Sequence, residues 1–227
     1  MMTRDSLSKH DLNGKKYLYT GLDVILEEIS TMTDLPEIYY QTLQDGINWQ
    51  IRSELTVERS ILSPGSTYPW VATLMAVGAQ VIFPDEARKS IPEFMKKRIN
   101  GSGAAVGLLI PIEFRNGRMC YQAVRPTPAS LPTVSICAFM EMDGEIVKDA
   151  RIAITGTWRN KLALVKSADL LIGKSLSDEQ ISKVIDSILK EIEPVTNFQA
   201  SAEYRIEMAK CLTQRSLSAC LTQGEVA

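Results

Sequence analysis

The stretch TVSICAFMEMDGEIVKDARIAITG, residues 133–156, decides the fold class of this chain. Two runs rich in β-branched and apolar residues, 133–142 and 145–156, flank Asp143-Gly144, a pair typical of a type I′ hairpin turn. In the second run, alternate residues from Ile146 to Ile154 share one side, which predicts a sheet with one covered face and one partly wet face. The sequence therefore predicts an antiparallel sheet here.

Further strands and helices are expected on both sides of this hairpin. Residues 106–114 and 119–125 read as two more strands. Ser177 and Gln180 form a capping box before a run with helical periodicity. Helices are expected at residues 20–29, 34–46, 67–78, 91–98, 161–172, 177–193 and 201–220, with Thr20, Thr67 and Ser201 as caps, Gly173 as a terminator, and short strands at 17–19 and 79–83. Helices, then antiparallel strands, then helices define an α+β chain.

Composition and charge exclude several classes of function. The 227 residues include 25 basic and 27 acidic side chains, so the chain lacks the positive excess of a nucleic-acid-binding protein. The single histidine, His10, excludes a histidine cluster for a metal. No Walker loop, G-x-G-x-x-G or G-x-S-x-G motif occurs. No residue is therefore assigned as catalytic or as a metal ligand.

The cysteines and the apolar runs indicate where the chain resides. Cys120, Cys137, Cys211 and Cys220 have no C-x-x-C spacing, and four such cysteines are typical of a reducing compartment. Residues 1–16 are polar and lack the apolar centre of a secretory signal. The longest apolar run, 70–83, is too short to span a bilayer. We expect a cytoplasmic protein that contacts no membrane and no nucleic acid.

Several segments resemble a known family. Ser201-Ala202-Glu203-Tyr204-Arg205, following Ile192-Glu193-Pro194-Val195, is similar to the C-terminal signature of the FAD-binding medium subunits of molybdenum hydroxylases. Residues 109–112 and 150–153 resemble two of the family's strands, and residues 51–53 and 63–69 resemble its flavin loop and the helix that follows. These segments fall in the family's order, and the resemblance runs from about Tyr17 to Arg215.

The resemblance implies the following organisation. Residues 1–16 are expected to form a flexible N-terminal arm, because they are polar and aperiodic. Residues 17–115 would form a diverged second lobe of an FAD-binding domain, with mixed helices and antiparallel sheet. Residues 116–227 would form a sheet-plus-helices domain that resembles the carbon monoxide dehydrogenase flavoprotein C-terminal domain. The family's first lobe, with its glycine-rich loop, has no counterpart in this sequence.

The second phosphate loop of the family departs most from its pattern. The family reads roughly T-I-G-G-N, and its glycines let backbone N–H groups approach the FAD pyrophosphate. The aligned residues here place Glu58 and Arg59 at the two glycine positions, and Glu58 adds a negative charge. Replacing both with glycine is therefore expected to raise flavin affinity. The candidate FAD-binding residues are Thr56, Val57, Glu58, Arg59, Ser60, Ser66, Thr67 and Tyr68.

Three functional hypotheses follow from the resemblance. In the first, the chain is the flavin subunit of a molybdenum hydroxylase type oxidoreductase and relays electrons through FAD from iron–sulfur partner subunits. In the second, it is a non-catalytic paralogue that has lost FAD and acts as a scaffold for partner subunits or a small ligand. In the third, a partner chain supplies the missing lobe. The partners implied are iron–sulfur and molybdenum-cofactor subunits, and a homodimer is also open.

Overall fold

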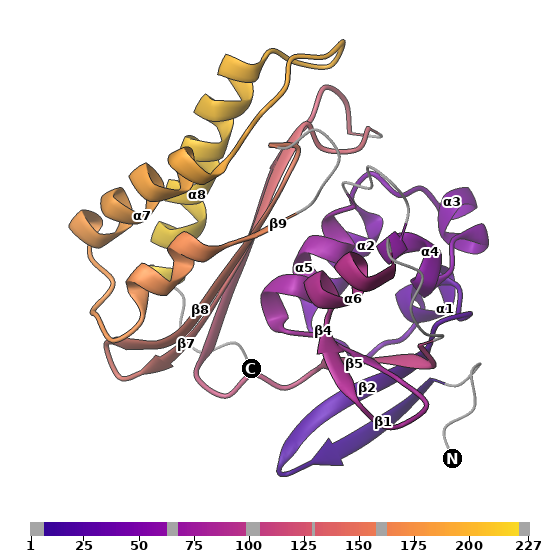
Figure 1. Cartoon of the computed structure of the whole chain (residues 1–227). Helices are drawn as coiled ribbons and strands as arrows, with labels where there is room; N and C mark the ends of the chain where they lie inside the picture. Colours follow the sequence, from indigo (N-terminus) through magenta and orange to yellow (C-terminus); the bar gives the residue numbers. More distant parts are fainter. Residues whose placement is uncertain (1–6, 63–67, 99–104, 129, 158–162, 223–227) are drawn as a thin grey trace.

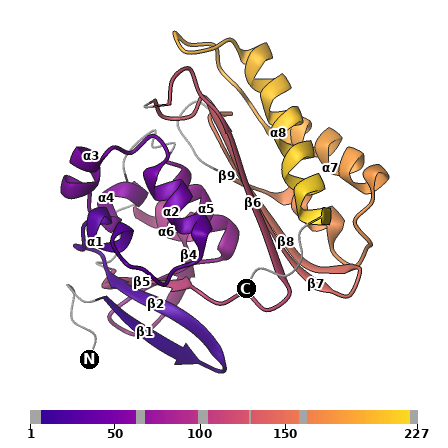
Figure 2. The same cartoon turned by 180° about the vertical axis from the view of Figure 1, so that it is seen from behind.

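A computed structural model of the 227-residue chain describes residues 7–62, 68–98, 105–128, 130–157 and 163–222. Two antiparallel sheets are separated by a layer of helices, and two long C-terminal helices cover the outer face of the second sheet (Figure 1). The view from behind shows the same layers, with the first sheet and its helices beside the long strands of the second (Figure 2). The predicted α+β class is therefore confirmed.

The first sheet has the strand order β1-β2-β5-β3-β4. Its strands are β1 (Leu7–Leu12), β2 (Lys15–Gly21), β3 (Gln80–Ile82), β4 (Arg88–Ser90) and β5 (Gly107–Pro111). The expectation of a flexible arm over residues 1–16 is wrong for residues 7–16, because β1 pairs with β2 along its whole length. The turn between them is Asn13-Gly14, with φ of 56° and 75°, which suits a tight hairpin. Residues 1–6 lie outside the described part.

The segments between the strands of this sheet form six helices, and α5 and α6 among them contact its strands. They are α1 (Leu26–Ser30), α2 (Glu37–Gln44), α3 (Trp49–Glu54), α4 (Val57–Leu62), α5 (Pro69–Val77) and α6 (Ile91–Arg98). The helix expected to begin at Thr20 begins at Leu26 instead, because Thr20 and Gly21 continue β2 and pair with β5. The cap of α5 falls at Tyr68, while the predicted cap Thr67 lies outside the described residues.

The second sheet has the order β6-β7-β8-β9, with β6 (Gly117–Val124), β7 (Val134–Asp143), β8 (Ile146–Thr155) and β9 (Ala163–Val165). The predicted hairpin is confirmed, but its turn is not type I′. Asp143 pairs with Ile146, and of the two central residues only Gly144 has a positive φ, 61°, which is the type II′ pattern.

The predicted alternation along residues 146–154 is interrupted by a β-bulge. The register shifts where Glu141 pairs with Asp149 and Met142 with Val147, so Lys148 is left over and the alternation changes phase. Val147 is consequently buried and Ile146 exposed. Beyond the bulge, Ile152 faces the C-terminal helices and Ala153 joins the core around α5, so this end of the sheet is covered on both faces. Nearer the turn, Asp149 and Arg151 leave the second face partly exposed, as predicted.

The C-terminal part comprises a 3-10 helix, η1 (Lys166–Leu171), and the helices α7 (Asp178–Glu191) and α8 (Ala202–Thr222). Of the α-helix expected over 161–172, residues 163–171 form β9 and η1 instead and residues 161–162 lie outside the described part, although Gly173 has the predicted left-handed conformation with φ of 76°. The caps Ser177 and Ser201 are confirmed, but the reciprocal half of the capping box is not, because the Gln180 side-chain oxygen has no hydrogen-bond partner among the described residues. The Ser177 hydroxyl accepts a hydrogen bond from the Gln180 amide, and the Ser201 hydroxyl accepts one from the Tyr204 amide.

Helix α5 joins the two halves of the molecule. All nine of its residues are buried, and its core cluster includes Cys137, Phe139 and Ala153 of the second sheet. A separate cluster lies between that sheet and the helices α7 and α8. Within the described ranges, none of the helices is both long enough and apolar enough to cross a membrane.

The four cysteines are free thiols, and their burial predicts unequal reactivity. Burial raises the pKa of Cys137 to about 12, so at pH 8 only about one such thiol in ten thousand is a thiolate. Cys120 and Cys220 are also buried, whereas Cys211 is half-buried. We expect Ellman's reagent at pH 8 to modify one thiol quickly, assigned to Cys211 by its loss in Cys211→Ser, and the other three only after urea unfolding. Two or more fast thiols in the folded protein would contradict this arrangement.

Candidate functional site

The residues predicted to form a phosphate-binding loop lie at the start of a helix. Thr56 forms an isolated bridge with Ile25, and Val57 is the first residue of α4. The Val57 amide donates to the Val24 carbonyl and the Glu58 amide to the Leu22 carbonyl, each at 2.9 Å. The expectation of a loop is therefore wrong: the segment before α1 folds against these residues and pairs with their backbone.

The amides of the next two residues are also engaged. The Arg59 amide donates to the Thr56 hydroxyl at 3.2 Å, and the Ser60 amide donates to the Thr56 carbonyl at 2.9 Å. The side chains of Val57 and Ser60 are fully buried. A pyrophosphate cradle needs several backbone N–H groups aimed at one anion. In this conformation Thr56–Ser60 do not fit a pyrophosphate.

The segment predicted to correspond to the family's flavin loop, Ile51-Arg52-Ser53, is part of α3. The Arg52 Nε lies 2.7 Å from the Glu27 carboxylate, and another guanidinium nitrogen donates to the Ile47 carbonyl at 2.6 Å. The hydrogen bond from Arg52 is the main reason that the pKa of Glu27 is lowered. This guanidinium therefore ties α3 to α1.

The other predicted flavin residues fall in two groups. Ser66 and Thr67 lie outside the described residues. Tyr68 is half-buried and packs against the first core, and its carbonyl accepts a hydrogen bond from the Val71 amide at 3.0 Å in the first turn of α5. The structure thus places Tyr68 at a helix start, where its visible role is structural.

A buried polar cluster that the sequence did not indicate connects the two halves. Asp45, at the end of α2, is paired with Arg125 and accepts a hydrogen bond from the Tyr121 hydroxyl, both on or next to β6. Burial raises the pKa of Tyr121 well above its ordinary value, so it remains a donor at neutral pH. Because Asp45 and its partners are 76 and 80 residues apart, no local motif could have marked this cluster.

The signature Ser201–Arg205 forms a structural junction at the start of α8. The Arg205 side chain is 4% exposed and donates to the Thr133 carbonyl at 2.8 Å and the Gly156 carbonyl at 2.7 Å. A further nitrogen donates to the Asn197 side chain at 2.8 Å. Arg205 therefore fixes the start of α8 to the edge where β7 begins and β8 ends.

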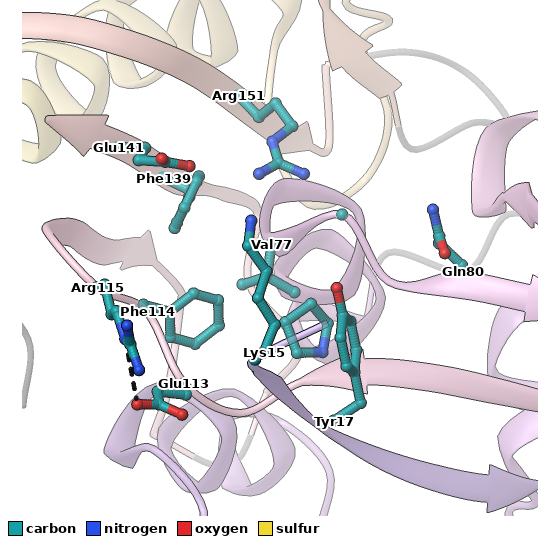
Figure 3. A pocket seen from close by; sticks show the side chains of 13 residues that line it. Lys15, Tyr17, Val77, Gln80, Glu113, Phe114, Arg115, Phe139, Glu141 and Arg151 are labelled. Atoms are coloured by element: carbon teal, nitrogen blue, oxygen red, sulfur yellow. Dashed lines mark ion pairs between the residues drawn. The ribbon is translucent and has the colours of Figure 1, made fainter. Parts of the chain in front are cut away.

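A cavity of about 270 Å³ lies between the β1–β2 turn, the carboxyl end of α5 and the strands β7 and β8 (Figure 3). Three cationic, two acidic and three aromatic side chains line it: Lys15, Arg115 and Arg151; Glu113 and Glu141; and Tyr17, Phe114 and Phe139. None of the predicted flavin residues that the structure describes lies in its wall. Across the described ranges, no group of histidine, cysteine and acidic side chains is arranged to hold a metal ion.

The chain is similar to one known domain family and to the medium chains of two dehydrogenases. The profile of the CO dehydrogenase flavoprotein C-terminal domain matches residues 119–220. The carbon monoxide dehydrogenase medium chain of Hydrogenophaga pseudoflava is 22% identical over 179 residues, which are 75% of this chain and 62% of that protein. The glyceraldehyde dehydrogenase medium chain of Sulfolobus acidocaldarius is 23% identical over 217 residues, 92% of this chain and 76% of that protein.

Solved structures show the same fold. A carbon monoxide dehydrogenase from Hydrogenophaga pseudoflava superposes with a TM-score of 0.79 at 16% identity, covering 96% of this chain and 78% of the matched chain. Quinoline 2-oxidoreductase from Pseudomonas putida 86 superposes with a TM-score of 0.70 at 17% identity, covering 94% and 78%. The likeness extends over both sheets.

The fold is thus that of the matched dehydrogenase chains. Residues 119–220 match the CO dehydrogenase flavoprotein C-terminal domain family, and the chain is similar over most of its length to the medium chains of carbon monoxide and glyceraldehyde dehydrogenases. The predicted resemblance is confirmed. The chain spans about 62% of the length of the Hydrogenophaga medium chain.

Proposed function

We propose that this chain is the medium-subunit component of a molybdenum hydroxylase type oxidoreductase assembly, with iron–sulfur and molybdenum-cofactor subunits as its partners. The observation that carries the proposal is the continuous correspondence with dehydrogenase medium chains, which includes both sheets and the C-terminal domain. The role belongs to an assembly because the matched relatives are medium chains of dehydrogenases.

The homology supports a flavoprotein role, in which FAD accepts electrons from the iron–sulfur partner and passes them to an external acceptor. The residues aligned with the second phosphate loop do not support binding of FAD by this chain alone. Val57 and Glu58 donate their amides to the backbone of residues 22–24, and Glu58 brings a negative charge to the same place. This observation favours the second hypothesis, a scaffold subunit that holds partner subunits together without its own FAD.

A flavin-binding experiment separates the two roles. We expect the purified chain to be colourless and to cause no saturable quenching of FAD fluorescence. We also expect no gain of affinity in the double variant Glu58→Gly, Arg59→Gly, contrary to the expectation from the loop alignment, because the cradle amides are already used within the fold. The two glycines within α4 should instead reduce stability by about 1–2 kcal/mol.

The controls for this experiment use the same segment. The variant Glu58→Ala, Arg59→Ala removes the same two side chains and preserves helix propensity, so it separates the loss of the side chains from the backbone freedom that glycine adds. A yellow protein, or a gain of FAD affinity in the glycine variant alone, would contradict the scaffold role and restore the loop interpretation. Co-purification of iron–sulfur and molybdenum-cofactor subunits with the tagged chain from its host tests the subunit role itself, and their absence would count against it.

A further inference from the structure

We propose that the cavity between the β1–β2 turn, the end of α5 and the strands β7 and β8 binds a small carboxylate that carries a flat apolar group. This inference does not rest on the subunit role, because the cavity wall contains none of the described residues that were predicted to contact flavin.

Two cations from different sheets converge on the cavity. Lys15 lies at the start of β2 and Arg151 lies on β8. The charged ends of the two side chains point toward one another into the cavity (Figure 3). Like charges that face each other repel, and an anion placed between them removes the repulsion. Among the residues that the structure describes, Lys15 has no carboxylate partner.

The carboxylates around the cavity are already engaged with cations. Glu113 pairs with Lys16 at 3.5 Å and with Arg115 at 3.7 Å. Glu141 pairs with Lys148 at 3.2 Å. Within the described part of the chain, these two acids therefore leave the positive charge of Lys15 without an ion-pair partner.

The Arg151 guanidinium is held in a fixed position. It pairs with Asp149 at 3.0 Å and stacks over the Phe139 ring at 4.7 Å from the ring centroid. Its other terminal nitrogen lies against Gly78, where an added Cβ would be only 1.8 Å away. The Nε is buried and has no hydrogen-bond partner among the described residues. A planar guanidinium held in place in this way suits the geometry of a carboxylate.

The size and the aromatic walls restrict the rest of the ligand. Cavities that hold drug-sized molecules measure roughly 300–1,000 Å³, so about 270 Å³ suits a smaller molecule. Tyr17 and Phe139 present ring carbons beside the two cations, and Phe114 closes the wall near Arg115 (Figure 3). A single ring that bears a carboxylate can place its anion between Lys15 and Arg151 and its ring against these side chains.

Benzoate is the probe for this site, and benzamide is the uncharged control of the same shape. We expect isothermal titration to show saturable binding of benzoate at a single site and no comparable binding of benzamide or of inorganic phosphate. Lys15→Met should weaken benzoate binding about tenfold or more, since a hydrogen bond to a charged partner is lost. Lys15 is exposed on a hairpin, so this variant should retain the stability of the wild-type chain. Arg151→Gln should weaken binding at least as much.

Lys183→Met is the matched control, because Lys183 is an exposed lysine on α7 whose visible partner is Glu179. It should leave benzoate affinity unchanged. Absence of saturable benzoate binding would overturn the inference, as would equal affinity in Lys15→Met and the wild type. Equal binding of benzamide would show that the anion is not recognised, and binding of phosphate without benzoate would show that the ligand is not a flat carboxylate. These outcomes are independent of whether FAD binds.

Discussion

Replacing Arg205 with methionine is expected to destabilise the chain by about 3 kcal/mol, because two buried carbonyls and the Asn197 side chain lose their donor at once. The guanidinium supplies hydrogen bonds to the carbonyls of Thr133 and Gly156 and to the Asn197 side chain, and its side chain is 4% exposed. Methionine retains much of the apolar volume, so the loss reports on the hydrogen bonds more than on packing. Urea unfolding followed by circular dichroism measures the difference.

The matched control for this variant is Arg215→Met, which removes an exposed arginine from the same helix, α8. We expect it to change the free energy of unfolding by less than about 0.5 kcal/mol. Arg205→Lys keeps a charge and one donor direction but not the planar group, so it should fall between the two. An Arg205→Met variant as stable as Arg215→Met would show that the junction does not depend on these hydrogen bonds.

Replacing Gly156 with alanine is expected to cost about 3 kcal/mol, from backbone strain and a steric clash together. Gly156 has φ of 76°, and an added Cβ would lie 1.9 Å from the Thr133 carbonyl oxygen, which is the same carbonyl that accepts from Arg205. The backbone carbonyl cannot move away without breaking that hydrogen bond. Thermal unfolding should therefore show a clearly lowered Tm.

Gly173 offers a control in which strain acts without the clash. It has the same φ of 76°, but no atom lies within 4 Å of an added Cβ. Gly173→Ala should cost only the left-handed conformation, about 1 kcal/mol. The difference between the two variants isolates the close approach at Gly156. Equal losses would show that conformation alone matters at both positions.

The C-terminal signature, residues 201–205, combines one local interaction with several long-range ones. Ser201 caps α8 within its own first turn, which is a local interaction that residue spacing reveals. Arg205, four residues later, acts on carbonyls 72 and 49 residues away. The sequence marked the segment through its resemblance to a family, and the structure assigns a physical role to its arginine.

Residues 56–60 form the start of a helix and not the expected loop, for a reason that the sequence does not show. Alignment with the family's glycine-containing loop placed residues 56–60 in a loop, with Glu58 and Arg59 at the two glycine positions. The fold brings Leu22 and Val24 to the same place, and their carbonyls take the Val57 and Glu58 amides. Because the two segments are more than thirty residues apart, periodicity and capping rules carry no information on this pairing.

The sequence by itself determined the α+β class, the β7–β8 hairpin, the caps of α7 and α8, and the family to which the chain is related. Each depends on neighbouring residues, through alternation, turn chemistry and capping, or on similarity along the chain. The strand β1 was missed because most of its residues are polar and none is fully buried, although Asn13-Gly14 is a local signal for a hairpin. Only the tertiary structure shows the Asp45 cluster, the backbone pairing of residues 56–60, and the approach of Lys15 to Arg151. Each joins residues that are far apart in the sequence, and packing around α5 brings them together.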